Sequence, residues 1–561
     1  MDGKASEIIK LWEQGDGDRG TWKSHWQRVT DYMQPDRNDY VTQKSPGQKR
    51  MRKIYDSHPI WCLEQFVAGC DSLLTSSTLQ WFFLRCDDDR IDKVARVRAW
   101  FEAASAAMYA VFNSSRHNFS PEQQSLYGDL GAVGTGVQAI LESKRSGILF
   151  STRHLKECVI YENEEGRVDT LIRRWEWTAK QAWQTWGSAA GNGVAEAMKD
   201  KPDTKFVFYH AVRPRMKRDP QRAGNLNMAF ESIYVSEADK RVISESGFQE
   251  FPYCVPRLSK ITGESWGRGR GMTALPDVQM LNELMKLVIE SGQLLVRPPY
   301  QLPDDGYILP IRAAPGSLIF YRAGLRQTDR LQKVDGGGQF DVGENMIEAL
   351  HNSIARIFYV DLFRMPTDPS DPNSEGKGST ATYWLQRRDK EMMQLSPMLT
   401  RLNSEDSGPK IERVFAMMWR QSVAKRFGPG AYFPPPPPEL SGQKWHAEYV
   451  SPIAIAQKSS RLDSVKQLIA QQAEIRQIDP QSPIYMDWQS IMRMSADDLN
   501  APAGALKTDE QLQAEAQQQA EAEAAMQNHM ALANVAQAAK DGTGAVKNLA
   551  DASSGQMREA A

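Results

Sequence analysis

The sequence predicts an α+β protein in which helices predominate. Its content of 41% hydrophobic and 25% charged residues is ordinary for a globular protein. Between residues 81 and 253, helical stretches alternate with short β-branched or aromatic runs. Over 274–295 and 347–357, apolar residues recur every three or four positions, as they do in helices that pack against helices. A chain of 561 residues suffices for about three or four folding units.

Charge and cysteine content narrow the class of protein. The chain has 68 Lys and Arg against 70 Asp and Glu, a formal net charge of -2, whereas tight binders of duplex DNA carry a basic excess. Its five cysteines form no CxxC motif and are too sparse for a disulfide framework. The start lacks signal-peptide features, and no apolar run approaches the roughly 18 residues of a membrane span. We expect a protein made in a cytoplasm, with reduced thiols and no membrane partner.

The N-terminal half has several recognisable segments. Trp22, Trp26 and Val29 share one face of an expected helix that ends before Pro35, and a second helix is expected near 61–74. Further helices are expected in VRAWFEAASAAMYAVFN and TAKQAWQTWG, and strands in GVQAIL, TLIRRWEW, KFVFYHAV and ESIYV. The glycines of LGAVGTGVQ predict a tight turn or a close backbone approach before a strand.

Two apolar seams flank a Pro- and Gly-containing insertion. They consist of Ala274, Val278, Leu281, Met285 and Val288, continued by Gly292 and Leu295, and of Ile347, Leu350, Ile354 and Ile357. We expect two helices that pack together as a thin stem. Their apolar stripes present more surface than such a stem can bury within one copy of the chain, so we expect copies to associate.

The remainder of the chain is divided by changes in composition. MPTDPSDPNSEGKGST after Leu362 predicts an exposed loop. Residues 380–427 have a helical pattern with an expected kink at Pro397 and an expected break at Ser407–Pro409. The prolines of 434–438 predict a stiff boundary, and the Ala/Gln-rich residues 503–561 predict a helix that needs partners or a disordered tail.

No catalytic chemistry is indicated. GRGRG at 267–271 misplaces the third glycine of a dinucleotide fingerprint and is better read as a turn into a helix. In SEGKGST, Gly378 stands where a Walker loop has Ser or Thr after Lys377. The acidic run 87–89 is more typical of a polar turn than of a cation site, and neither HExxH nor GxSxG occurs. We expect no catalytic residue, cofactor or metal.

Several stretches resemble the head-to-tail connector, or portal, family of short-tailed (T7-like) phages. They are the Trp-rich opening that ends at Pro35, RKIYDSHPI, LLTSSTLQWFFL, NFSPEQQSLYGDLGAVGTG, FYHAVRPR and SWGRGRGMTALPDVQMLNEL, which together span roughly residues 20–430. The stretch from Trp266 to Leu284 is the most telling, and the match fades after Pro438.

The resemblance implies a portal-type fold of wing, stem, clip and crown, assembled as a ring with a central channel. Mapped onto this sequence, the parts are a mixed α+β wing at 1–273, stem helices at 274–297 and 342–361, a clip at 298–341, a tunnel loop at 362–379, a long kinked wing helix at 380–427, a crown at 428–502 and a barrel or tail at 503–561.

The resemblance also implies a function and partners. The expected protein is a non-enzymatic ring of twelve copies at one capsid vertex, which contacts double-stranded DNA, the terminase large subunit, tail adaptor and tail tube proteins, and the major capsid and scaffolding proteins. Lys377, Arg387 and Arg388 would face DNA in the channel. The clip residues Arg312, Arg322, Arg326, Arg330 and Lys333 would meet terminase or adaptor. A tail adaptor or internal ejection protein is the alternative, and a packaging ATPase is a weaker one.

Overall fold

The computed structural model describes residues 3–296, 340–363 and 394–449 apart from short gaps, two short strands at 300–301 and 332–333, and helical segments between 464 and 530. The chain forms two compact units. The larger unit comprises Met1–Arg85, Ala103–Pro436 and Trp445–Gln457, and the smaller comprises Cys86–Glu102, Pro437–Lys444 and Lys458–Ala561. One junction between them therefore falls inside the 434–438 proline run.

A five-stranded antiparallel sheet forms one part of the larger unit. Its strands are, in spatial order, β4 (Cys158–Glu162), β5 (Val168–Thr178), β6 (Lys205–Pro214), β7 (Phe230–Ser236) and β8 (Arg241–Phe248). Because successive side chains point to opposite faces, Tyr209 packs with Ala5 and Ile8 of α1 (Gly3–Asp18), whereas Phe208 packs on the other face. That face is covered by α7 (Ala179–Trp186) and α8 (Asn192–Asp200). The expected strands in this part of the chain are confirmed.

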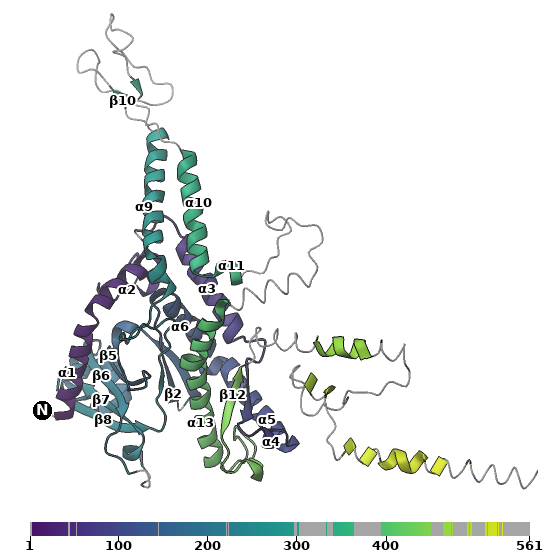
Figure 1. Cartoon of the computed structure of the whole chain (residues 1–561). Helices are drawn as coiled ribbons and strands as arrows, with labels where there is room; N and C mark the ends of the chain where they lie inside the picture. The colour runs from purple at the N-terminus through teal and green to yellow at the C-terminus, as the bar shows by residue number, and fades with distance from the viewer. Residues whose placement is uncertain are drawn as a thin grey trace, which may run out of the picture. The chain divides into compact units, whose positions relative to one another are not determined.

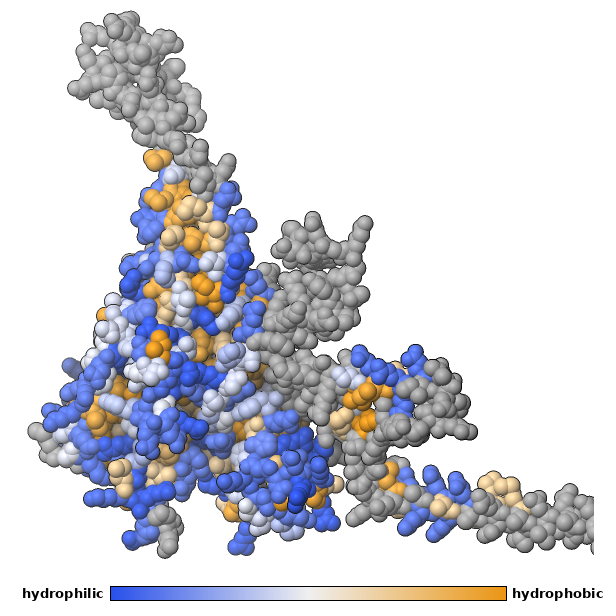
Figure 2. All heavy atoms as spheres, viewed as in Figure 1, coloured by the Kyte–Doolittle hydropathy of each residue, from blue (hydrophilic) through white to orange (hydrophobic). Residues whose placement is uncertain are grey.

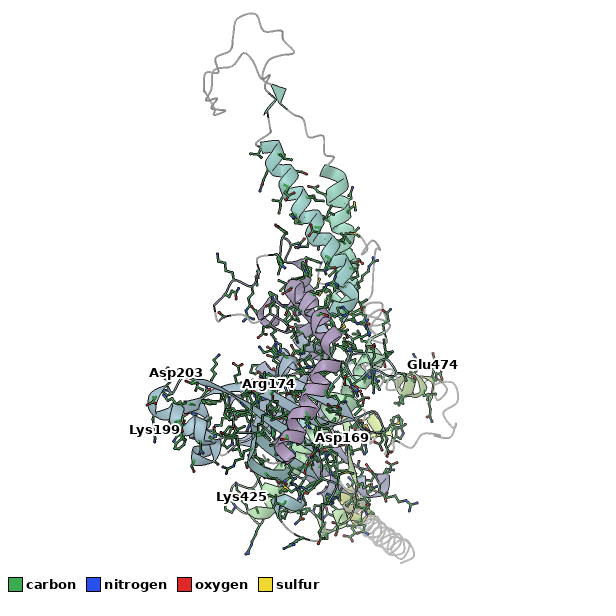
Figure 3. The ribbon with its side chains drawn as sticks, turned by 90° about the vertical axis from the view of Figure 1, so that its left-hand side faces the viewer. Asp169, Arg174, Lys199, Asp203, Lys425 and Glu474 are labelled. Atoms are coloured by element: carbon green, nitrogen blue, oxygen red, sulfur yellow. The ribbon has the colours of Figure 1, made fainter. Side chains whose placement is uncertain are left out.

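Helix α1 is also held to the sheet by polar and aromatic contacts. The guanidinium of Arg174 lies 5.3 Å from the ring centroid of Trp12 (Figure 3). The Tyr161 hydroxyl donates a hydrogen bond of 2.7 Å to the Leu11 carbonyl. Both faces of the sheet are therefore covered, and α1 is part of the fold.

A helical layer with a small second sheet contains most of the core. It consists of α2 (Gly20–Met33), α3 (His58–Leu74), α6 (Phe119–Val133) and a three-stranded sheet of β3 (Gly147–Arg153), β2 (Val137–Ser143) and β9 (Tyr253–Cys254). Trp26 and Val29 are fully buried, and Trp26 meets Trp266 edge-on with ring centroids 5.0 Å apart. The helix expected around Trp26 is confirmed, and Pro35 begins the short 3-10 helix η1 (Pro35–Arg37) just after it.

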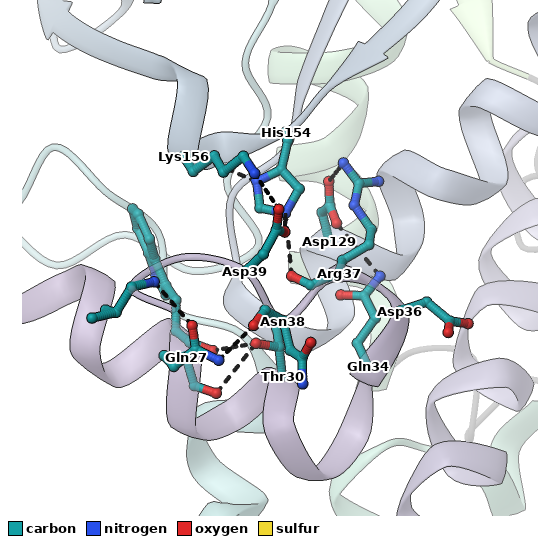
Figure 4. Close-up of polar contacts among 12 residues, drawn as sticks. Gln27, Thr30, Gln34, Asp36, Arg37, Asn38, Asp39, Asp129, His154 and Lys156 are labelled. Carbon is teal, nitrogen blue, oxygen red and sulfur yellow. Dashed lines mark hydrogen bonds and ion pairs between the residues drawn. The ribbon is translucent and has the colours of Figure 1, made fainter. Parts of the chain in front are cut away.

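The loop after α2 is fixed by a polar network (Figure 4). The Gln27 amide donates to the Asn38 carbonyl at 2.6 Å, and Arg37 pairs with the buried Asp129 of α6 at 3.0 Å. Asp39 pairs with His154 at 3.0 Å and with Lys156. Hydrogen bonding from His154 and then Lys156 lowers the pKa of Asp39, whereas burial raises the pKa of Asp129. The loop thus joins α2 to both α6 and the β3–β4 connection.

The long helix near the end of the larger unit differs from the prediction. A helix at 394–402 continues through a π-helical turn, Asn403–Ser407, into α13 (Gly408–Ala424), so the break expected at Ser407–Pro409 is wrong. Pro409 is the second residue of α13 and directly follows the wider π-helical turn. The Lys410 ammonium, 1% exposed, pairs with Asp406 at 2.5 Å and donates to the Gln123 amide oxygen at 2.5 Å. Residues 380–393 lie outside the described part of the chain.

The remaining elements are small. β1 (Phe82–Cys86) and β12 (Trp445–Tyr449) form a two-stranded sheet, and α5 (Ala95–Asn113) has residues in both units. The described part of the smaller unit includes α4 (Asp89–Asp92) and the 3-10 helix η9 (Pro438–Leu440). There the Asp87 amide donates to the Lys444 carbonyl at 3.0 Å, and Asp88 caps α4 by accepting from the Arg90 amide. The acidic run is therefore a helix-capping turn.

Candidate functional site: the α9 and α10 helices

Two long helices, α9 (Arg270–Val296) and α10 (Phe340–Ile357), pack side by side and extend from the body of the larger unit (Figure 1). They run antiparallel. Ser353 donates to the Asp277 carboxylate at 2.8 Å near the body, and a Cβ added to Gly343 would meet Val288 at 3.4 Å nearer the other end. The chain between them contains β10 (Tyr300–Gln301) and β11 (Gln332–Lys333), which pair with each other.

The predicted seams hold this pair of helices together and join it to the core. Ala274, Leu281 and Ile354 are completely buried, and Val278 is 2% exposed. Ile347, Leu350 and Ile357 are half-buried and pack against the same core, while Met285 and Val288 are half-buried on α9. In the single chain the fully buried members are covered by their own core, whereas the half-buried ones keep part of their surface accessible, and a role of the seams in contacts between copies stays a prediction.

The glycines before α9 permit a close approach of two backbones. Gly134 ends α6 with a φ of +85°, and a Cβ there would lie 2.1 Å from the Arg268 carbonyl carbon. A Cβ at Gly269 would lie 2.6 Å from the Ala132 carbonyl oxygen. The Gly267 amide donates to the Thr135 hydroxyl at 2.7 Å. GRGRG is therefore the junction that seats α9 on the end of α6: residues 267–269 are irregular backbone and the helix begins at Arg270.

The segment between Lys53 and His58 attaches both long helices to the body. The Tyr55 amide donates to the Asn282 side-chain oxygen of α9 at 2.8 Å, and the Asn282 amide donates to the Lys53 carbonyl at 2.9 Å. Asn282 is only 5% exposed, so both bonds lie away from solvent. On α10, His351 donates to the Asp56 carboxylate at 2.7 Å. No local sequence pattern indicates these contacts, because the partners are more than 200 residues apart.

A second apolar stripe on α9 is exposed. Met280, Leu287 and Leu294 are 55%, 56% and 53% exposed. They are spaced by seven residues, which is close to two helical turns, so they lie along one side of the helix, away from the buried seam. Hydrophobic side chains are visible at the surface of the α9–α10 pair (Figure 2). Single exposed leucines are common, but a row of three along one helix is typical of a contact surface.

The family of the chain follows from a comparison of sequences. A family model for the bacteriophage head to tail connecting protein matches residues 5–506, which is nearly the whole chain. The chain belongs to this family. The resemblance noted in the sequence is thereby confirmed.

Two relatives of this head-to-tail connecting protein are named as portal proteins. The "probable portal protein" of Bordetella phage BPP-1 is 27% identical over 487 residues, covering 84% of this chain and 83% of the relative. The "portal protein" of Salmonella phage epsilon15 is 26% identical over 490 residues, covering 85% and 84%. A chain in the virion of a native gene transfer agent particle covers 81% of this chain at 10% identity, but with a TM-score of 0.34.

Most site residues predicted for this head-to-tail connecting protein lie outside the described residues. These are Lys377, Arg387 and Arg388 for the channel, and Arg312, Arg322, Arg326 and Arg330 for the clip. Lys333 ends β11, and its backbone pairs with Tyr300 of β10. The roles of all eight stay predictions.

In the described part of the chain, the cysteine thiols are buried and the side chains that could bind a metal ion do not cluster. Its five cysteines are free and buried, and burial raises the pKa of the Cys62, Cys158 and Cys254 thiols to about 12. Among the residues with a described placement, no group of three or more His, Cys, Asp or Glu could hold a metal ion. None of the helices searched is long and apolar enough to cross a membrane.

Proposed function

We propose that this chain is the portal subunit of a phage, a structural protein without enzymatic activity whose ring passes the genome into and out of the capsid. The observation that supports this most is the match to two portal proteins over 84% and 85% of the chain. A tail adaptor or ejection protein would leave this match unexplained. A packaging ATPase would need a phosphate-binding loop, and SEGKGST has Gly378 in place of the Ser or Thr that should follow Lys377.

Copies of the chain would associate through the stripe Met280, Leu287 and Leu294. Each copy in a closed ring meets its two neighbours through two different surfaces, so one apolar row on α9 can pack against a different part of the next copy. The implied number of copies is twelve, and the ring would occupy the portal vertex beside the capsid and scaffolding proteins.

Electron microscopy of the purified full-length chain tests the proposal. We expect rings with a central hole and a mass near twelve times 63.2 kDa. A chain that stays monomeric at micromolar concentration, with its helices folded, contradicts the ring.

The segment between α9 and α10 would be the docking surface for terminase and then for the tail adaptor. Arg322 and Arg326 belong to a locally basic run that suits an acidic partner. Reversing both charges, Arg322→Glu with Arg326→Glu, is expected to weaken terminase binding at least tenfold in a pull-down titration while rings still form, since rim charges act mainly on partner binding. Unchanged binding would mean that these arginines are only solvated surface.

The segment predicted as a tunnel loop, 362–379, would line the channel and touch DNA beyond its first two residues, since Leu362 and Phe363 belong to α11 (Val360–Phe363) and pack against the core. Lys377 stands between two glycines, and Arg387 and Arg388 follow, which suits weak phosphate contacts that salt screens. Deleting Asp368–Gly376 is expected to leave ring and prohead assembly intact but to reduce the yield of full-length packaged DNA. Normal packaging and retention by the deletion variant would remove this segment from the channel.

A further inference from the structure

A pair of histidines joins α10 to the start of α3. His58 is the first residue of α3, and its ring stacks on that of His351 with centroids 4.1 Å apart and planes 25° apart. His58 Nε2 donates to the His351 carbonyl at 3.1 Å and lies 3.3 Å from the Cys62 sulfur. The contact therefore lies where one of the two long helices meets the body.

The carboxylate beside the pair accepts one hydrogen bond from each histidine, and its charge opposes, without reversing, the lowering of the pKa of His58. One oxygen of Asp56 accepts from the His58 backbone amide at 2.8 Å, and the other accepts from His351 Nε2 at 2.7 Å. The Asp56 side chain is only 9% exposed. Asp361, the other carboxylate close by, acts on the Cys62 thiol rather than on His58.

Protonation therefore affects the two rings differently. A proton on His351 creates an ion pair with Asp56, which the geometry accommodates. A proton on His58 then places a second cation against the first, with ring centroids 4.1 Å apart, in a partly buried site. Like charges at this separation repel each other. The intact contact thus favours a neutral His58.

We propose that His58 and His351 form a pH-sensitive latch that attaches α10 to α3 at neutral pH and weakens when His58 gains a proton. Burial and the neighbouring His351 lower the pKa of His58 in the folded chain. A histidine with a lowered pKa binds fewer protons when folded than when released, so acid favours release. The proposal concerns one chain and does not depend on a ring.

Hydrogen exchange of the full-length chain at pH 7.5 and 5.5, corrected for the intrinsic effect of pH, tests the latch. From pH 7.5 to 5.5, the equilibrium constant for opening of the α10 segment 347–355 is expected to increase by up to about tenfold. The reason is that released His58 takes up one proton near its ordinary pKa of about 6.5. In His58→Gln, whose amide can still donate to the His351 carbonyl, the increase should be less than about twofold.

Two controls separate the latch from general acid destabilisation. His446→Gln changes an exposed histidine of β12 and should keep the full response. Residues 408–424 of α13, which include no histidine, should not respond in any variant. If His58→Gln folds poorly, His351→Gln is the second variant: it removes the opposing charge but not the burial of His58, so it should reduce the response without abolishing it. Exchange of 347–355 that is independent of pH in the unaltered chain would overturn the proposal. So would an exchange that depends on pH in His58→Gln, or in His351→Gln where only that variant folds, as strongly as in the unaltered chain.

Discussion

Leu281→Asp is expected to leave little folded protein. Leu281 is completely buried in the core cluster that joins α9 to α2 and α6. The substitution removes a buried leucine side chain, at about 2–5 kcal/mol, and leaves a carboxylate without a partner, at several kcal/mol more. Because domains are stable by only about 5–15 kcal/mol, the sum is close to the whole free energy of unfolding. Circular dichroism melting and soluble yield measure the loss.

Leu287→Asp on the same helix is the matched control. In a single chain Leu287 is 56% exposed, so its aspartate stays in water and the melting temperature of the monomer should change little. A Leu281→Asp chain that melts like the unaltered protein would show that the base of α9 is not part of the core.

Replacing all three residues of the exposed stripe, Met280, Leu287 and Leu294, by glutamate is expected to abolish ring formation without unfolding the chain. If a neighbour covers these side chains, their replacement removes about 1–2 kcal/mol of apolar burial each and forces charges into the contact. A loss of about 4 kcal/mol lowers each association constant by roughly a thousandfold. Sedimentation or mass photometry should then show monomers, with the helical circular dichroism signal unchanged.

The same helix provides a control with the same spacing. Gln279, Lys286 and Gln293 are also seven residues apart but lie along a different side of α9, and Gln279 accepts a hydrogen bond from Arg28. Three glutamates at these positions should leave rings intact. Rings of normal size in the stripe variant, or equal loss in both variants, would contradict the assignment of the stripe to the contact between copies.

Sequence patterns predicted the elements whose side chains repeat regularly. The spacing of Trp22, Trp26 and Val29 gave α2, and β-branched runs gave β5, β6 and β7. For α9, the apolar residues that recur every three or four positions from Ala274 predicted the helix, which in the structure begins four residues earlier, at Arg270. Local periodicity carries this information because burial of one face requires it.

Other features could not be predicted from local patterns. An exposed Leu287 and a buried Leu281 are the same residue type, and only the position of the body distinguishes them. The partners His58 and His351 are 293 residues apart, so no window of sequence contains both. The Ser407–Pro409 break was predicted because glycine and proline usually end helices, but a buried ion pair and a change of helix type carry the chain through.

The π-helical turn also determines how this part of the chain tolerates insertions and deletions. Buried positions lie on both sides of it, at Leu395 and Leu402 before and at Ile411 and Val414 after. A π-helical turn holds one residue more than an α-helical turn. Losing the exposed Ser404 would restore an ordinary α-helical turn and leave the apolar face of α13 directed at the core. Losing one residue within α13 itself has no such outlet, because it would rotate the rest of that helix by about 100°.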